Sequence, residues 1–185
     1  FATLGASVSA YYGVRTITRS RRSVILATVL YTLMPYRFTN IFSRGDLGET
    51  LALTFWPLLL VGLYHICIGD RKKWYLLVIG LTGVLQSHIL SAAIAAVICI
   101  LTVLLYVVRI FREKRYCEIG KTVGLTLLLN AWYLIPFLTY YFGESLKKEE
   151  LRWSSYFEQS INLSNMTQSL SLYNKQYFSL GFALL

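Results

Sequence analysis

Residues 34–60 read Met34-Pro-Tyr-Arg-Phe-Thr-Asn-Ile-Phe-Ser-Arg-Gly-Asp-Leu-Gly-Glu-Thr-Leu-Ala-Leu-Thr-Phe-Trp-Pro-Leu-Leu-Leu60, and this stretch decides the fold. It places two arginines, an aspartate and a glutamate between two long apolar segments. Charge this close to hydrocarbon is unfavourable unless it has a partner, a water-filled cavity or a function. We therefore expect two membrane-spanning helices joined by a polar loop that carries the candidate site.

The composition of the whole chain supports a membrane protein. Its 185 residues are 56% hydrophobic, above the apolar share of ordinary soluble domains. The 18 Lys and Arg residues outnumber the 9 Asp and Glu residues and lie in short clusters between apolar runs. This pattern is typical of the cytoplasmic loops of a polytopic membrane protein, whereas a nucleic-acid-binding protein spreads its basic residues over a soluble surface. The sequence thus predicts the lipid bilayer as a partner and excludes nucleic acid.

The apolar runs predict an all-α, polytopic transmembrane bundle over residues 1–142. Segment 1–14 is too short to cross roughly 30 Å of hydrocarbon at about 1.5 Å per residue, so we expect it to end a helix that begins upstream. About five further spans are predicted, at 23–38, 50–68, 74–85, 89–111 and 122–142. The polar remainder, 143–185, is expected to form a tail with short interfacial or soluble helices.

The basic clusters set the predicted topology. Clusters at 15–22, 71–73 and 109–121 all fall on one side of the membrane, which the excess of Lys and Arg identifies as the inside. The loop 39–49, the turn 86–88 and the tail 143–185 then lie outside.

Five residues on the outer side form the candidate site: Arg37, Arg44, Asp46, Glu49 and His88. The two arginines could hold a phosphate or pyrophosphate, a task suited to the guanidinium fork. Asp46 or Glu49 could act as a general base toward a hydroxyl or hold a divalent cation. His88 could contact the phosphate or carry a proton. No pair of the three cysteines has metal-ligand spacing, so no protein metal site is predicted.

A purely structural interpretation of the same residues remains open. Asp46 and Glu49 precede an apolar run, where acidic residues cap a helix and favour the positive end of its dipole. Arg37 could anchor the chain at the membrane interface, and Arg44 could pair with either carboxylate. His88 could simply occupy a tight turn.

Several motifs resemble one known family. They are Pro35-Tyr36-Arg37, Arg44-Gly45 with Leu47 and Glu49, Pro57-Leu58, Ser87-His88 after an apolar run, and Asn130-Ala-Trp-Tyr-Leu-Ile-Pro-Phe. Together they resemble the bacterial 6-pyruvoyl-tetrahydropterin synthase-related integral membrane domain, over most of residues 1–142. The zinc-binding histidine set that a soluble pterin-forming enzyme needs is lacking.

That family is similar to the polytopic GT-C glycosyltransferases and to bacterial membrane proteins of lipoteichoic acid glycosylation. The resemblance implies sugar transfer from a polyprenyl-phosphate donor to a cell-envelope glycan or lipid, at the outer face of the bacterial cytoplasmic membrane. It implies roles for Arg37, Arg44, Glu49 and His88. Asp46 falls where we expect a small residue in relatives. GT-C enzymes usually carry an essential acidic residue in the first outer loop, which we expect upstream of Phe1.

Two other functions are compatible with the sequence. A lipid or polysaccharide transporter would place its site near the bilayer midplane on broken helices. A non-catalytic membrane scaffold would have outer-loop charges that pair with each other and line no cavity.

Overall fold

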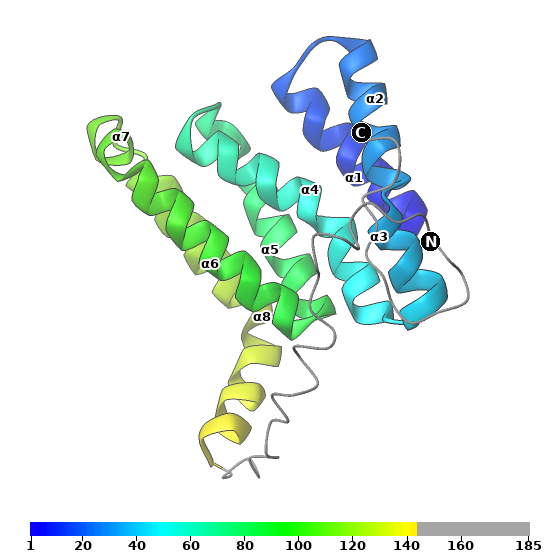
Figure 1. The fold of residues 1–185 in the computed structure, drawn as a ribbon. Coiled ribbons are helices and arrows are strands. Elements are labelled where there is room, and N and C mark those ends of the chain that lie inside the picture. The colour runs from blue at the N-terminus through cyan, green and yellow to red at the C-terminus, as the bar shows by residue number, and fades with distance from the viewer. Residues whose placement is uncertain (144–185) are drawn as a thin grey trace, which may run out of the picture.

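A computed structural model describes residues 1–143 of the chain, and these residues fold into helices without any strand (Figure 1). The elements are α1 (Ala2–Ile17), α2 (Arg21–Thr32), α3 (Pro35–Phe38), the π-helical turn η1 (Thr39–Arg44), α4 (Leu47–Cys67), the 3-10 turn η2 (Arg71–Lys73), α5 (Tyr75–Ser87), α6 (Ile89–Leu105), α7 (Val107–Arg112) and α8 (Tyr116–Gly143). The all-α prediction is confirmed. Of the predicted tail 143–185, Gly143 is the last residue of α8, and residues 144–185 lie outside the described residues.

Two of the described helices are long and apolar enough to cross a membrane. They are Leu47–Cys67 in α4, with 21 residues, and Tyr116–Tyr140 in α8, with 25 residues. The apolar helix Ile89–Leu105 is shorter. The structure therefore does not bear out about five full-length spans: two predicted spans are interrupted, and the predicted span 74–85 forms a helix of only 13 residues, α5.

Both interruptions have a visible backbone origin. The predicted span 23–38 breaks at Met34, whose ψ of 124° is extended and is followed by Pro35 at the first position of α3. Proline disfavours the helical conformation in the residue before it, and it lacks a backbone N–H for the preceding turn. The predicted span 89–111 breaks at Tyr106, with φ −102° and ψ 12°, which separates α6 from α7.

Helix α4 lies at the centre of the fold. It packs most extensively against α5 and also against α1, while α2 packs on α1 and both α6 and α8 pack on α5 (Figure 1). The α4–α5 contact is close because glycines face it from both helices: a Cβ added at Gly80 would lie 2.4 Å from the backbone nitrogen of Leu59. Small residues at such contacts let helix backbones approach, which is a common mode of packing in membranes.

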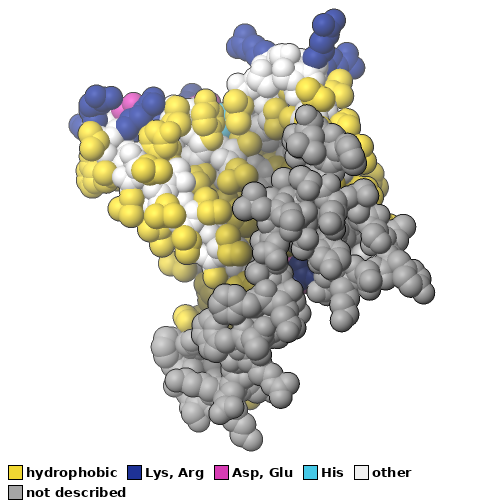
Figure 2. Space-filling model, in the orientation of Figure 1, with side chains coloured by type: hydrophobic (Ala, Val, Ile, Leu, Met, Phe, Trp, Pro, Cys, Tyr) yellow, Lys and Arg dark blue, Asp and Glu magenta, His cyan; other side chains and the backbone are white. Residues whose placement is uncertain are grey.

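Lys and Arg side chains gather at one end of the bundle. Figure 2 shows them at the top, where Figure 1 places the connections α1–α2, α4–α5 and α7–α8. We call this the basic end. The opposite end, formed by α3, η1, the start of α4 and the α5–α6 junction, carries the predicted site and is called the site end. The side surface between them is rich in exposed hydrophobic side chains, such as Leu90, Leu104 and Leu128.

Candidate functional site

The predicted loop 39–49 is a compact helical arm. Its first half is η1, which continues from α3, and Gly45 ends this turn with a φ of 64°, a left-handed conformation that glycine adopts without strain. The backbone N–H groups of Gly45 and Asp46 both donate to the carbonyl of Asn40, the latter at 3.1 Å. Helix α4 then begins at Leu47, so the arm holds its charged residues in fixed places.

Arg44 and Glu49 form an ion pair at the site end. Arg44 Nη1 lies 3.1 Å from Glu49 Oε2 and also donates to Asn40 Oδ1 at 3.2 Å. The Tyr36 hydroxyl donates to the other carboxylate oxygen, Glu49 Oε1. The Glu49 side chain is 15% exposed and that of Arg44 is 42% exposed. The Glu49 side chain thus accepts hydrogen bonds from two donors, and the arginine remains accessible from outside.

Asp46 and His88 are N-caps of neighbouring helices. Asp46 Oδ1 accepts from Glu49 N at 2.9 Å, at the start of α4. His88 Nδ1 accepts from Ser91 N at 3.2 Å, at the start of α6, so the neutral ring carries its proton on Nε2. The two caps lie close in space, since a Cβ added at Gly48 would be 3.5 Å from Asp46 Oδ1 and 3.4 Å from His88 Cδ2.

Arg37 is a buried cation at the same end. Its side chain is 1% exposed, its Cζ lies 5.6 Å from the ring centroid of Tyr31, and Nη2 donates to the Ala2 carbonyl at 3.4 Å. Its Nε and Nη1 have no hydrogen-bond partner among the described residues, and the same holds for Nδ2 of the fully buried Asn40. An interfacial anchor would expose its guanidinium, so Arg37 does not fit that alternative.

The structure brings four of the five predicted residues into one neighbourhood. Arg44 and Glu49 pair directly, Asp46 caps the turn that contains Glu49, and His88 lies beside Gly48. Arg37 comes from the preceding helix. Within the described residues, no hydrogen bond or ion pair joins it to the other four. The predicted residues therefore share one end of the bundle. Arg37 differs from the other four because its Nε and Nη1 have no hydrogen-bond partner among the described residues.

A second polar cluster ties α5 to α8. Gln86 Nε2 donates to Asn130 Oδ1 at 3.0 Å, and Asn130 Nδ2 donates to Thr82 Oγ1 at 3.1 Å. Asn130 is fully buried. Asn130 therefore links α8 to α5, and the side-chain amide of Gln86 is used in this link.

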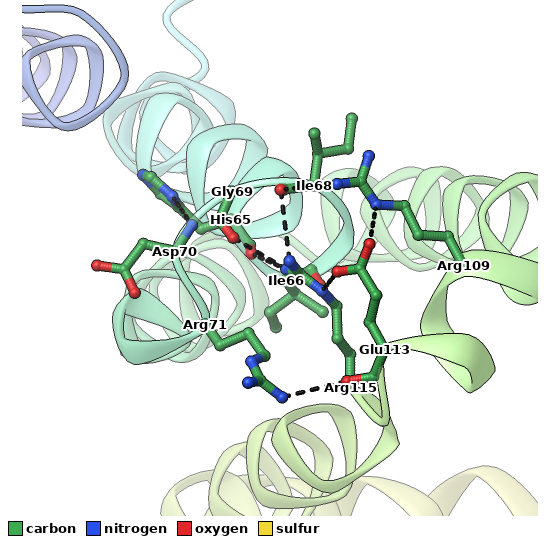
Figure 3. Close-up of polar contacts among 9 residues, drawn as sticks. All are labelled: His65, Ile66, Ile68, Gly69, Asp70, Arg71, Arg109, Glu113 and Arg115. Carbon is green, nitrogen blue, oxygen red and sulfur yellow. Dashed lines mark hydrogen bonds and ion pairs between the residues drawn. The ribbon is translucent and has the colours of Figure 1, made fainter.

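The basic end contains a network that the sequence pattern did not reveal (Figure 3). Arg115 is 6% exposed, and its Nη1 donates to the carbonyls of His65, Ile66 and Gly69 at 3.0–3.2 Å. Its Nε donates to Glu113 Oε2 at 2.7 Å, and Arg109 Nε donates to Glu113 Oε1 at 2.7 Å. Arg115 thereby satisfies carbonyls that the C-terminus of α4 leaves without helical partners. Hydrogen bonds from Arg115 and Arg109 lower the pKa of Glu113.

The sequence of the chain matches the family of the 6-pyruvoyl-tetrahydropterin synthase related domain, described as membrane protein, over residues 1–185. The chain belongs to this family. Membership of the 6-pyruvoyl-tetrahydropterin synthase related domain family agrees with the two long apolar helices and with the apolar side surface. No curated protein and no solved structure shows significant similarity to the chain.

The chain has two histidines, His65 and His88, which lie at opposite ends of the bundle. Within the described part of the chain, no group of three or more His, Cys, Asp or Glu side chains gathers as in a metal site.

Proposed function

We propose that the protein is a GT-C-like membrane glycosyltransferase of the bacterial cytoplasmic membrane. The site end faces the outside and the basic end faces the cytoplasm, in line with the positive-inside rule. The enzyme takes a sugar from a polyprenyl-phosphate donor and transfers it to a hydroxyl of a cell-envelope glycan or lipid.

The observation that carries this proposal is the buried guanidinium of Arg37. A buried charge is unfavourable unless it is paired and hydrogen-bonded, and Arg37 has two unpartnered N–H-bearing nitrogens and no carboxylate partner in the described residues. A phosphate oxygen would supply both the charge and the acceptors that are missing. Asn40 Nδ2, on the next turn, offers a further donor.

The neighbouring residues suggest how the donor is held. Arg44 is partly exposed, so its guanidinium can leave Glu49 Oε2 and bind a phosphate oxygen instead. Glu49 would then be a better base, because it has lost a donor that stabilises its anion. His88 presents an Nε2–H that can donate to the phosphate. Asp46 remains a cap and is given no part in the chemistry.

In the proposed reaction, the bond between the anomeric carbon and the donor phosphate oxygen breaks, and a bond forms to the acceptor oxygen. The acceptor proton passes to Glu49, and polyprenyl phosphate leaves with its charge stabilised by the arginines. No step is assigned to a divalent cation.

A non-catalytic scaffold is the second candidate, and the Arg44–Glu49 pair favours it, because mutual pairing of outer charges is what a scaffold predicts. Arg37 distinguishes the two functions. In a scaffold, Arg37 contributes to stability through Tyr31 and the Ala2 carbonyl, and its removal lowers the melting temperature. As a ligand contact, Arg37 is an unpaired buried charge in the free protein.

The test measures stability and donor binding of Arg37→Met, which keeps the length of the side chain. We expect an unchanged or higher melting temperature in detergent, together with loss of binding of a short-chain polyprenyl-phosphate sugar by about tenfold or more. Arg112→Met, an exposed arginine at the basic end, is the control and should bind normally. A lower melting temperature with unchanged donor binding would support the scaffold instead.

A further inference from the structure

A second cationic site lies at the basic end, between α1 and α2. A pocket of about 230 Å³ opens there, and its lining includes the side chains of Arg15, Arg19 and Arg21 but no acidic residue. Tyr11 of α1 and Val24 of α2 also line the pocket. We infer that this pocket binds the phosphate headgroup of an anionic phospholipid in the adjacent leaflet, independently of the proposed sugar transfer.

The charges in this pocket are not neutralised by the described part of the protein. None of the three salt bridges described involves Arg15, Arg19 or Arg21. Arg15 is held in place by a 2.7 Å hydrogen bond from Nη1 to the Tyr11 hydroxyl, with its Cζ 5.8 Å from the Tyr11 ring centroid. A guanidinium fixed in this way keeps its remaining N–H donors for an anion, and arginine forks match phosphate oxygens.

The surroundings of the pocket favour a lipid over a soluble phosphate. Along α1, Val8 precedes Tyr11 and Arg15 at helical spacing, and Val8 is 67% exposed. Along α2, Ile25 follows Arg21 by one turn and is 46% exposed. A strip of exposed apolar side chains thus leads away from the cationic pocket on each helix. A ligand with an anionic head and hydrocarbon tails matches both surfaces, and tyrosine is common at this depth of a membrane.

The experiment uses the full chain purified in detergent. Native mass spectrometry measures retention of phosphatidylglycerol relative to phosphatidylcholine, two lipids that differ in headgroup charge. Arg19→Gln/Arg21→Gln removes two pocket charges whose side chains make no hydrogen bond or ion pair with the described residues, so the helices should still pack. We expect the preference for phosphatidylglycerol to fall roughly tenfold or more, because two of the charges that attract an anionic headgroup are removed.

The control variant is Arg22→Gln/Arg112→Gln, which removes two exposed arginines from the same end outside the pocket. It should keep the preference of the wild type. Equal loss in both variants would overturn the inference, because the effect would then depend on total charge alone. Displacement of the lipid by millimolar inorganic phosphate would also overturn it, since the occupant would be a soluble anion.

Discussion

Gly62 of α4 lies so close to α5 that a Cβ atom at this position would stand 2.2 Å from the backbone nitrogen of Leu77. The contacted atoms belong to the backbone and cannot rotate away. The two central helices therefore depend on glycine at this crossing, and their separation sets the position of everything attached to them.

The first prediction follows from that contact. Gly62→Ala should destabilise the protein by about 2 kcal/mol or more, because overpacking at a backbone contact forces the helices apart. The measurement is thermal unfolding in detergent. Gly124→Ala on α8 is the matched control: the added carbon meets no atom within 4 Å other than its chain neighbours and the nearby backbone of its own helix, so it should be neutral or stabilise by up to about 1 kcal/mol. Equal melting temperatures for the two variants would contradict the close packing.

The second prediction concerns pH and Glu113. Because Arg115 and Arg109 lower its pKa below the usual 4.5 in the folded protein, the carboxylate adds stability above that pH, and this contribution is lost as the pH falls through the folded-state pKa. The difference in melting temperature between wild type and Glu113→Gln should be constant from about pH 5.5 to 7 and shrink below about pH 4. A difference that persists unchanged at about pH 3 would refute the assignment.

The third prediction separates capping from chemistry at Asp46 and His88. Alanine at either position should lower stability by about 1 kcal/mol through loss of the cap. Asn also caps helices, so Asp46→Asn and His88→Asn should restore the melting temperature. If the proposed roles hold, donor binding recovers in Asp46→Asn but stays reduced in His88→Asn. Full binding in His88→Asn would leave His88 with a capping role alone.

The fourth prediction addresses the link between α5 and α8. A double-mutant cycle with Gln86→Leu and Asn130→Leu should give a coupling energy of about 0.6 kcal/mol and at most about 1.7 kcal/mol, the mean and the maximum for hydrogen bonds between membrane helices. The control cycle pairs Gln86→Leu with Thr139→Val, whose hydroxyl donates within its own helix to Ile135 O. That cycle should show no coupling. A value near zero in the first cycle would mean that the 3.0 Å contact adds no stability.

Local chemistry allowed some of the helix boundaries to be predicted, such as the junction of α5 and α6. The polar triplet before Ile89 indicated a break, and His88 is the single non-helical residue there. The basic clusters were expected together and lie at one end. The loop 39–49 was misjudged, because polar residues and two glycines are typical of a loop, whereas π-helical hydrogen bonding extends the helix through Arg44.

Burial and long-range contacts could not be predicted from the sequence. Arg37 was expected at the interface or in the site, and its burial follows from the packing of α1 and Tyr31 around it. The sequence pattern identifies Arg115 only as one of the positive charges of the inner cluster 109–121. Its partners are carbonyl groups near residue 66, and a backbone carbonyl leaves no signature in a sequence.

The attachment of Arg115 to the end of α4 has a mechanical consequence. A helix of 21 residues is about 30 Å long, and here its last turn is clamped through carbonyls while its first turn carries Glu49. With this end fixed, a tilt of α4 would displace mainly its other end. A tilt of about 5° would move Glu49 by roughly 2–3 Å, which is enough to separate it from Arg44. A rotation about the end that Arg115 holds would therefore open the ion pair at the opposite end of the bundle.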